Sequence, residues 1–301
     1  MILTTPLFKE LKRIFPDSEL YVLAGKIYAD IPKNLGCVDY TYEYSKKVPS
    51  TAKLILTLRK KAFDYWIDPK DEFSTTSKIL EKLCKPKISI GFNIKEKVFD
   101  INLKNFVKGE HRVDINLSPV KFLSECNEYK RVLPHIDIPS VDAANIQSQL
   151  IEIHGTKVLL NLSTGIEARN LDVDKWIEVV NGIAESKNII ITGMKKDYEK
   201  INTVLNACGR KAVFFIKTKT IFELAELIKQ CSLLITPDTS AVHLASCFNT
   251  PVVCMFNNVK WNKVKFAPLS EKQKIIVSDD ENSFRNIAPD QVIKAAYELL
   301  T

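Results

Sequence analysis

The chain has 301 residues, of which 46% are hydrophobic, and its 43 basic and 36 acidic side chains give a net charge of +7. At about 100–200 residues per domain, this length favours two domains, and the mixed charge excludes a disordered chain. No apolar run reaches the roughly 18 residues that cross a bilayer, and the charge is too small for a dedicated nucleic-acid binder. The seven cysteines are scattered without a CxxC pair, which predicts reduced thiols, a cytoplasmic location and no bound metal.

Short β-rich runs alternate with helical patterns along the chain, which predicts parallel sheets built from βαβ units. In the first half we expect helices at 6–15, 53–60, 77–84 and 111–126, and strands at 20–24, 65–67 and 88–91. In the second half we expect strands at 157–162, 189–192, 212–215, 233–236 and 252–256, and helices at 175–184, 198–207, 221–231, 241–247 and 289–300. Residues 129–144 contain two prolines and no helical period, so we expect a linker there.

This linker predicts an N-terminal Rossmann-like domain at 1–140 and a C-terminal Rossmann-like domain at 141–301. Two α/β halves predict a cleft in which ligands lie at the carboxyl ends of strands. Residues 51–100 carry 11 basic and 7 acidic side chains. That excess suits an anionic partner or an acidic membrane surface, and a solvated face explains it equally well.

The most informative stretch places polar residues directly after a buried strand. The strand at 233–236 leads into Pro237-Asp-Thr-Ser240 at the start of a helix, and His243 follows one turn later. A helix N-terminus at the carboxyl end of a strand attracts anions, because free backbone N–H groups point out of it. Asp238 can then accept hydrogen bonds from sugar hydroxyls beside the anion. The alternative is that one of these residues only caps the helix.

A second polar loop, Asn161-Leu-Ser-Thr-Gly-Ile-Glu-Ala-Arg169, follows the first strand of the second half. Ser163 and Thr164 can wrap a phosphate, and Arg169 can pair with it. The alternative is an ordinary polar loop between a strand and a helix. The loop lacks GxGxxG, so the fingerprint of a dinucleotide-dependent dehydrogenase is absent.

A third candidate is Thr192-Gly-Met194 with Asp197 three residues further on. Met194 can lie against a nucleoside base and Asp197 can bind its ribose, although a glycine turn before a helix explains the pattern as well. Thr4 and Thr5, at the start of the first helix, either face the cleft or cap that helix, with Thr5 as the N-cap.

Taken together, these stretches resemble glycosyltransferase family nine, the heptosyltransferase family of lipopolysaccharide core assembly. The most specific segment is Thr236-Pro-Asp-Thr-Ser-Ala-Val-His-Leu-Ala245, followed by Asn249-Thr-Pro-Val-Val253. Similar residues occur along nearly the whole chain, at Leu3-Thr-Thr-Pro6, Leu58-Arg-Lys-Lys-Ala-Phe-Asp-Tyr-Trp-Ile-Asp68, Ile88-Ser-Ile-Gly-Phe92 and His111-Arg-Val-Asp114. The sequence departs from the family at Met194 and Asn257, where the family usually has glycine.

The resemblance implies a fold of the GT-B type, in which two Rossmann-like domains with parallel sheets face each other across a cleft. It also implies inverting, metal-independent transfer of a sugar, usually heptose, from a nucleotide-sugar such as ADP-heptose. The implied acceptor is the lipopolysaccharide core or a related glycolipid, and no cofactor takes part. We therefore expect a cytoplasmic monomer that contacts the inner membrane peripherally and binds no nucleic acid.

The resemblance also implies roles for individual residues. Asp238 would hold the donor sugar hydroxyls, and the amides of Thr239, Ser240 and Ala241 would hold the diphosphate. The complete donor-binding set that we expect is Ser163, Thr164, Arg169, Met194, Asp197, Asp238, Thr239, Ser240, Ala241 and His243, with Thr4 and Thr5 as acceptor-side candidates.

The resemblance leaves the catalytic base without a residue in this chain. In the family the base is the Asp of a Gly-Asp pair just ahead of the Leu-Thr-Thr-Pro segment, which would fall immediately before Met1. A βαβ domain also normally begins with a strand, whereas this sequence starts almost at a helix. We therefore expect a chain that lacks its first strand and its base, and the codons upstream of Met1 test this. The alternatives are a non-catalytic nucleotide-sugar-binding relative, or a nucleotide-sugar epimerase of similar architecture that acts without an acceptor.

Overall fold

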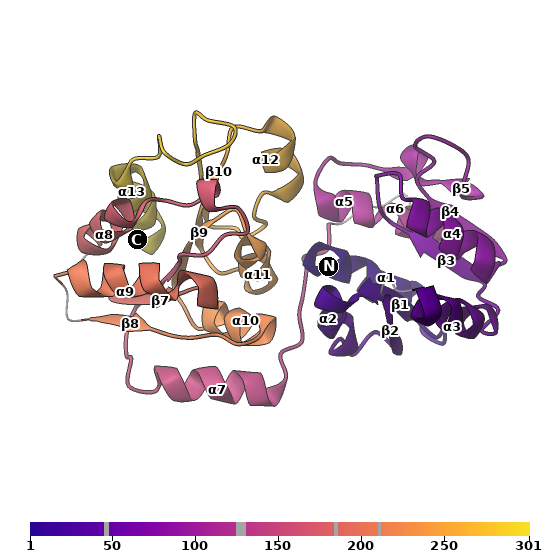
Figure 1. Cartoon of the computed structure of the whole chain (residues 1–301), viewed down its shortest axis with the longest axis horizontal. Helices are drawn as coiled ribbons and strands as arrows, with labels where there is room; N and C mark the ends of the chain where they lie inside the picture. Colours follow the sequence, from indigo (N-terminus) through magenta and orange to yellow (C-terminus); the bar gives the residue numbers. More distant parts are fainter. Residues whose placement is uncertain (45–47, 125–130, 184–185, 210–211) are drawn as a thin grey trace. The chain divides into compact units, whose positions relative to one another are not determined.

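The computed structural model describes residues 1–44, 48–124, 131–183, 186–209 and 212–301. They divide into two compact units, Met1–Pro134 (unit 1) and His135–Thr301 (unit 2) (Figure 1). Every strand pair among the described residues is parallel. The predicted α/β class with parallel sheets is therefore confirmed.

Unit 1 contains two small sheets, one with the order β1-β2 and one with the order β3-β4-β5. Its elements are η1 (Ile2–Thr4), α1 (Thr5–Ile14), β1 (Tyr21–Gly25), η2 (Lys26–Tyr28), α2 (Asp30–Lys33), β2 (Tyr40–Tyr44), α3 (Val48–Arg59), β3 (Tyr65–Asp68), α4 (Thr75–Cys84), β4 (Ile88–Gly91), β5 (Ile101–Asn102), η3 (Leu103–Phe106), α5 (Arg112–Asn116) and α6 (Ser118–Leu123). Part of its core is a cluster of Ile90, Phe92, Leu103 and Ile115.

The prediction of one helix at 111–126 is wrong, because two short helices, α5 and α6, divide this segment at Leu117. Pro119 lies in the first turn of α6, where its missing N–H costs nothing, but it could not lie inside a continuous helix. Cys126, at the end of the predicted helix, lies outside the described residues. Strand β2 was not predicted.

Unit 2 contains one six-stranded sheet with the order β11-β10-β9-β6-β7-β8. Its elements are α7 (Ser140–Leu150), β6 (Lys157–Asn161), η4 (Glu167–Arg169), α8 (Val173–Gly182), β7 (Asn188–Thr192), η5 (Lys195–Asp197), α9 (Tyr198–Ala207), β8 (Val213–Phe215), α10 (Ile221–Lys229), β9 (Leu233–Pro237), α11 (Ser240–Phe248), β10 (Val252–Phe256), α12 (Lys260–Phe266), β11 (Gln273–Val277) and α13 (Pro289–Leu300).

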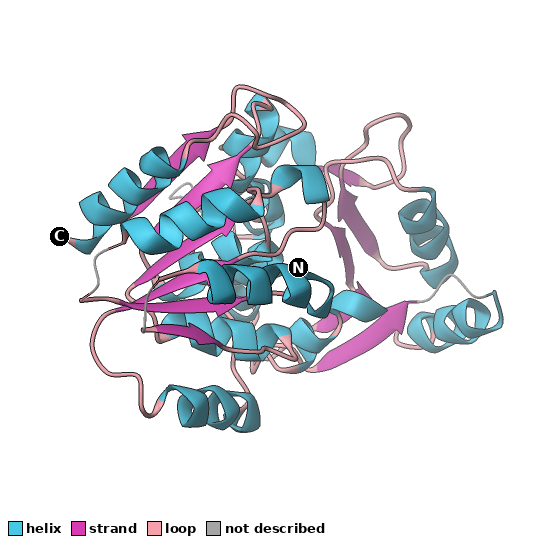
Figure 2. Ribbon diagram, turned by 60° about the vertical axis from the view of Figure 1, so that its left-hand side comes forward, coloured by secondary structure: helices cyan, strands magenta, loops and turns pink. Residues whose placement is uncertain are grey.

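Helices cover both faces of this sheet (Figure 2). Helices α8, α9 and α13 pack together on one face, and α7, α10 and α11 pack together on the other. Strands β9 and β10 are buried along their whole length, as the continuous apolar runs of a parallel sheet require. The predicted strands and helices of this half agree with the structure to within a few residues at their ends, but α12 and β11 were not predicted.

The prediction that residues 129–144 form a linker is wrong at its end, because α7 begins at Ser140 and Pro139 occupies its N-cap position. Polar contacts hold α7 against α10. They join Thr220 to Asp142, Asn145 to Glu223 at 3.1 Å, and Gln147 to Glu226 at 2.9 Å. Hydrogen bonds therefore contribute to its docking together with the buried side chains of Ile146 and Leu150.

Candidate functional site in unit 2

The candidate site lies at the carboxyl edge of the unit 2 sheet. Strand β6 pairs with β7 on one side and with β9 on the other. From β6 the polypeptide continues to β7 on one side, and it later returns to form β9 on the other side of β6. Such a switch point is where ligands bind in open α/β sheets. The three polar loops singled out in the sequence follow β6, β7 and β9, so the structure brings them to this one edge.

A buried amide joins the loops of β6 and β9. Asn161, the last residue of β6, is only 5% exposed. Its Nδ2 donates to the hydroxyl of Thr236 at 2.9 Å and lies 3.3 Å from the hydroxyl of Thr239. Its Oδ1 accepts from the backbone N–H of Ser163 at 3.3 Å. One side chain thus fixes the start of both loops.

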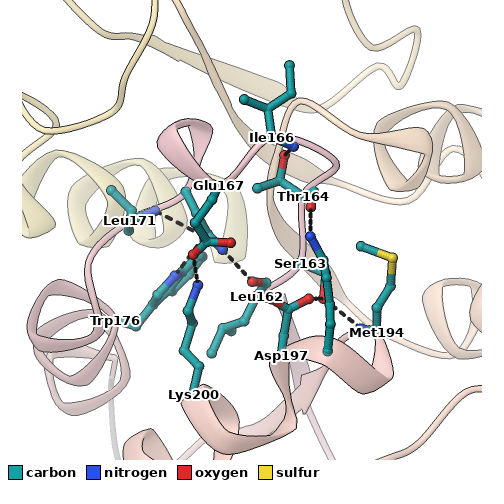
Figure 3. A network of polar contacts seen from close by, with 12 residues as sticks. Leu162, Ser163, Thr164, Ile166, Glu167, Leu171, Trp176, Met194, Asp197 and Lys200 are labelled. Carbon is teal, nitrogen blue, oxygen red and sulfur yellow. Dashed lines mark hydrogen bonds and ion pairs between the residues drawn. The ribbon is translucent and has the colours of Figure 1, made fainter.

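A second set of contacts joins the loops of β6 and β7 (Figure 3). The hydroxyl of Ser163 donates to Oδ2 of Asp197 and accepts the backbone N–H of Met194 at 2.6 Å. Asp197 is 5% exposed, whereas Met194 is 46% exposed at the surface of the site. Gly193 lies so close that a Cβ there would come within 2.6 Å of the Ser163 hydroxyl. Ser163 and Asp197 therefore bond to each other.

Cationic groups surround the loop after β6. Lys196 donates to the carbonyl of Thr164 at 2.8 Å, and Lys200 pairs with Glu167. Arg169 is half-buried, and its guanidinium makes no hydrogen bond or ion pair with another residue that the structure describes. Its positive charge is therefore available to an anion.

Helix α11 begins directly after β9, with Thr239 at its N-cap. The Thr239 hydroxyl accepts the backbone N–H of Ala241 at 3.3 Å, so the Ala241 amide is already paired. Within the described residues, the amides of Thr239 and Ser240 have no hydrogen-bond acceptor, as is usual at the first turn of a helix. Of the three amides predicted for a diphosphate, two are available. The predicted cap is therefore confirmed, and it leaves two amides of this terminus open.

Asp238 lies between this helix terminus and α12. Asn262 of α12 donates to Oδ2 of Asp238 at 2.7 Å. The pKa of Asp238 is raised above its ordinary value, because the effect of burial outweighs the opposing hydrogen bond from Asn262 and charge of Arg169. The carboxylate is half-buried, and its other oxygen, Oδ1, accepts no hydrogen bond from the described residues. This oxygen can accept a hydrogen bond from a ligand hydroxyl.

The remaining predicted residues differ in their surroundings. His243 lies on α11 with its ring 6.0 Å from that of Phe266, which places it on packed helix surface. In unit 1, Thr5 is fully buried, and its hydroxyl donates to the Ile2 carbonyl at 2.8 Å. The prediction of Thr5 as an N-cap is wrong, because α1 begins at Thr5 itself. Thr4 is half-buried and accepts from Asn116 at 3.3 Å.

The described residues contain no group of three or more His, Cys, Asp or Glu side chains that could hold a metal ion. No helix in the described parts of the chain combines the length and the apolar composition needed to cross a membrane.

No role at this edge was predicted from the sequence for three asparagines and one lysine, although Asn161 and Asn257 were named. Asn161 and Asn257 each follow or end an apolar strand, and a polar amide at that position was the available signal. Asn262 lies on α12, a helix that the hydrophobic pattern did not predict. Lys196 lies in a turn with two lysines, a pattern that is typical of solvated surface.

Comparisons with known proteins agree with this architecture. The model of glycosyltransferase family 9 (heptosyltransferase) matches residues 51–294. Lipopolysaccharide heptosyltransferase 3 of Escherichia coli is 23% identical over 274 residues, which cover 85% of this chain and 79% of that protein.

Two solved structures are similar over almost the whole chain. A glycosyltransferase of family 9 from Veillonella parvula has a TM-score of 0.81 at 17% identity and covers 99% of this chain and 93% of its own. The ADP-heptose lipopolysaccharide heptosyltransferase II of E. coli has a TM-score of 0.76 at 17% identity, covering 100% and 95%. These likenesses confirm the expected GT-B type of fold. Since the family model spans most of the sequence, this chain belongs to glycosyltransferase family 9, the heptosyltransferase family.

Proposed function

We propose that the chain transfers heptose from ADP-heptose to the lipopolysaccharide core or a related glycolipid. Its membership of the family and the names of its relatives, which act on lipopolysaccharide, support this proposal. The observation that carries it is that Asp238 directly precedes the N-cap of α11, whose first amides are open, and interacts with the charge of Arg169. That arrangement offers acceptors to a sugar and donors to a diphosphate within a few residues.

In this proposal the diphosphate binds at the switch point between β6 and β9. The amides of Thr239 and Ser240 donate to it, and Arg169 supplies the positive charge. These groups are fixed before the reaction, so they stabilise the charge that develops on the leaving nucleoside diphosphate. They make a metal ion unnecessary for that purpose, and we propose a metal-independent reaction.

The nucleoside lies over the loop after β7, with the exposed Met194 against the base. We assign Ser163 and Asp197 a positioning role, because the hydroxyl of one and the carboxylate of the other are engaged within the protein. Oδ1 of Asp238 accepts hydrogen bonds from hydroxyls of the sugar. The acceptor hydroxyl attacks the anomeric carbon in one displacement, which inverts its configuration, and a general base must take its proton.

Binding and transfer are tested separately. Calorimetry with ADP-heptose should give measurable affinity for the wild type and none for Asp238→Ala. Asp290→Ala, which removes an exposed carboxylate from α13, is the matched control and should bind as the wild type does. Transfer is followed with heptose-deficient lipopolysaccharide as acceptor, with and without EDTA, and the product anomer is assigned by NMR.

Each outcome selects one function. Heptose transfer that survives EDTA supports the proposal, and the opposite anomer at the new bond supports inversion. Donor binding without transfer identifies a non-catalytic nucleotide-sugar-binding relative. Conversion of the donor without acceptor identifies an epimerase. Absence of binding to both ADP and ADP-heptose would overturn the proposal.

A further inference from the structure

Two buried asparagines form a chain of amide side chains behind Asp238. Asn257, directly after β10, is 1% exposed, and Asn262 on α12 is 7% exposed. Nδ2 of Asn257 donates to the backbone carbonyl of Glu281. Nδ2 of Asn262 lies 3.2 Å from Oδ1 of Asn257 and 2.7 Å from Oδ2 of Asp238. These hydrogen bonds therefore connect the loop after β11 to the carboxylate of Asp238, the candidate sugar-binding group.

The backbone carbonyl at one end fixes the direction of every hydrogen bond in this chain. A carbonyl only accepts, so Asn257 must present its NH₂ group to Glu281 and its oxygen to Asn262. Asn262 must then present its NH₂ group, which has two N–H donors for two acceptors, the amide oxygen of Asn257 and the carboxylate of Asp238. If the amide of Asn262 were rotated by 180°, its oxygen would face another acceptor at both of its contacts.

We propose that Asn262, oriented by Asn257, is a positioning residue that keeps the Asp238 carboxylate ionised and aimed at the donor sugar. This inference rests on the proposed function of Asp238. A donated hydrogen bond stabilises the ionised form of a carboxylate, and it also fixes the oxygen that remains for the ligand.

The surroundings of Asp238 show why such support is needed. Burial opposes its ionisation, and Arg169 in the loop after β6 is the cation that favours it. On β10 the neighbouring titratable group is the thiol of Cys254, whose pKa burial and the Asp238 charge both raise, so it stays neutral. If Arg169 also binds the diphosphate, the hydrogen bond from Asn262 still stabilises the charge of Asp238.

The test measures ADP-heptose affinity by calorimetry between pH 5 and 8 for the wild type, Asn262→Ala and Asn262→Asp. Asn258→Ala removes an exposed amide from the loop between β10 and α12 and is the matched control. Loss of a hydrogen bond to a charged group should weaken binding by about tenfold or more near pH 6. The acidic limb of the pH profile should move to higher pH. Asn262→Asp keeps the size of the side chain and adds a like charge, so the limb should move further.

ADP is measured in parallel as a probe that lacks the sugar, and its affinity should change little. The inference would be overturned if the acidic limb lay at the same pH for the wild type and Asn262→Ala. It would also be overturned if Asn262→Ala lost ADP-heptose affinity by the same factor at every pH. If Asn262→Ala unfolds, Asn257→Ser removes the group that orients Asn262 and should move the limb in the same direction by less. A wild type that binds ADP-heptose while Asp238→Ala binds equally well would instead refute the role of Asp238 in the proposed function.

Discussion

A single methyl group at Gly193 tests whether the contact between the loops of β6 and β7 is as tight as the structure shows. A Cβ at this position would lie 2.6 Å from the Ser163 hydroxyl and 3.0 Å from the end of Ile201. Ordinary contacts begin at 3.4 Å, so the hydroxyl would have to move by about 0.8 Å. That movement would lengthen its bonds to the Met194 amide and to Asp197.

Crowding of this kind costs about 1–3 kcal/mol. For a unit of this size, each kcal/mol lowers the melting temperature by roughly 2–4 °C, so Gly193→Ala should melt at a temperature roughly 2–12 °C lower. We also expect weaker ADP-heptose binding, because Met194 would shift. Thermal unfolding followed by circular dichroism measures the first effect, and calorimetry measures the second.

Gly165→Ala is the matched control. Gly165 lies at the same edge of the unit 2 sheet, and a Cβ there meets nothing within 4 Å. Its φ angle is not positive, so alanine fits the backbone and should be neutral or stabilise by up to about 1 kcal/mol. The reasoning is refuted if Gly193→Ala melts with the wild type, or if both variants lose stability equally.

Three further predictions concern single groups. Ser163→Ala leaves the buried Asp197 carboxylate without its hydroxyl donor and should cost about 1–3 kcal/mol by urea unfolding, with Ser163→Thr closer to the wild type; equal stability of Ser163→Ala and the wild type would contradict the contact. Thr239→Ala removes the N-cap of α11 and should cost about 1 kcal/mol, which Thr239→Ser should recover, and equal losses for both would contradict a cap. Burial raises the pKa of Cys231 to about 12, so its thiol stays protonated in the folded chain when the unfolded chain ionises near pH 9. The contribution of the Cys231 thiol to the free energy of unfolding is fully present below pH 9 and is lost as the pH rises above it. Between pH 8 and 10, Cys231→Ser should therefore lose less stability than the wild type. Equal losses for both would refute this prediction.

The sequence predicted the sheet of unit 2 well because its strands are continuous apolar runs bounded by polar loops. It also placed the three loops at one edge, since parallel strands end on the same side. It could not show that Ser163 and Asp197 bond to each other, because strand order fixes where a residue lies and leaves the direction of its side chain open.

Other parts of the site left weaker signals. Helix α12 is short and rich in lysine, so no period predicted it, and Asn262 was missed with it. Asn257 was noticed only as a departure from the family. The break between α5 and α6 was missed because both pieces share one apolar pattern, and Pro119 was the only signal for the new start.

The polar docking of α7 bears on how this protein can be divided into fragments. Glu223 and Glu226 are each no more than 3% exposed, and amides of α7 donate to both. A fragment that began after Leu150 would leave two carboxylates on α10 without these donors, at an apolar surface that α7 had covered. A fragment that begins at His135 keeps the helix and its donors, so it is the piece suited to crystallisation or NMR of unit 2 alone.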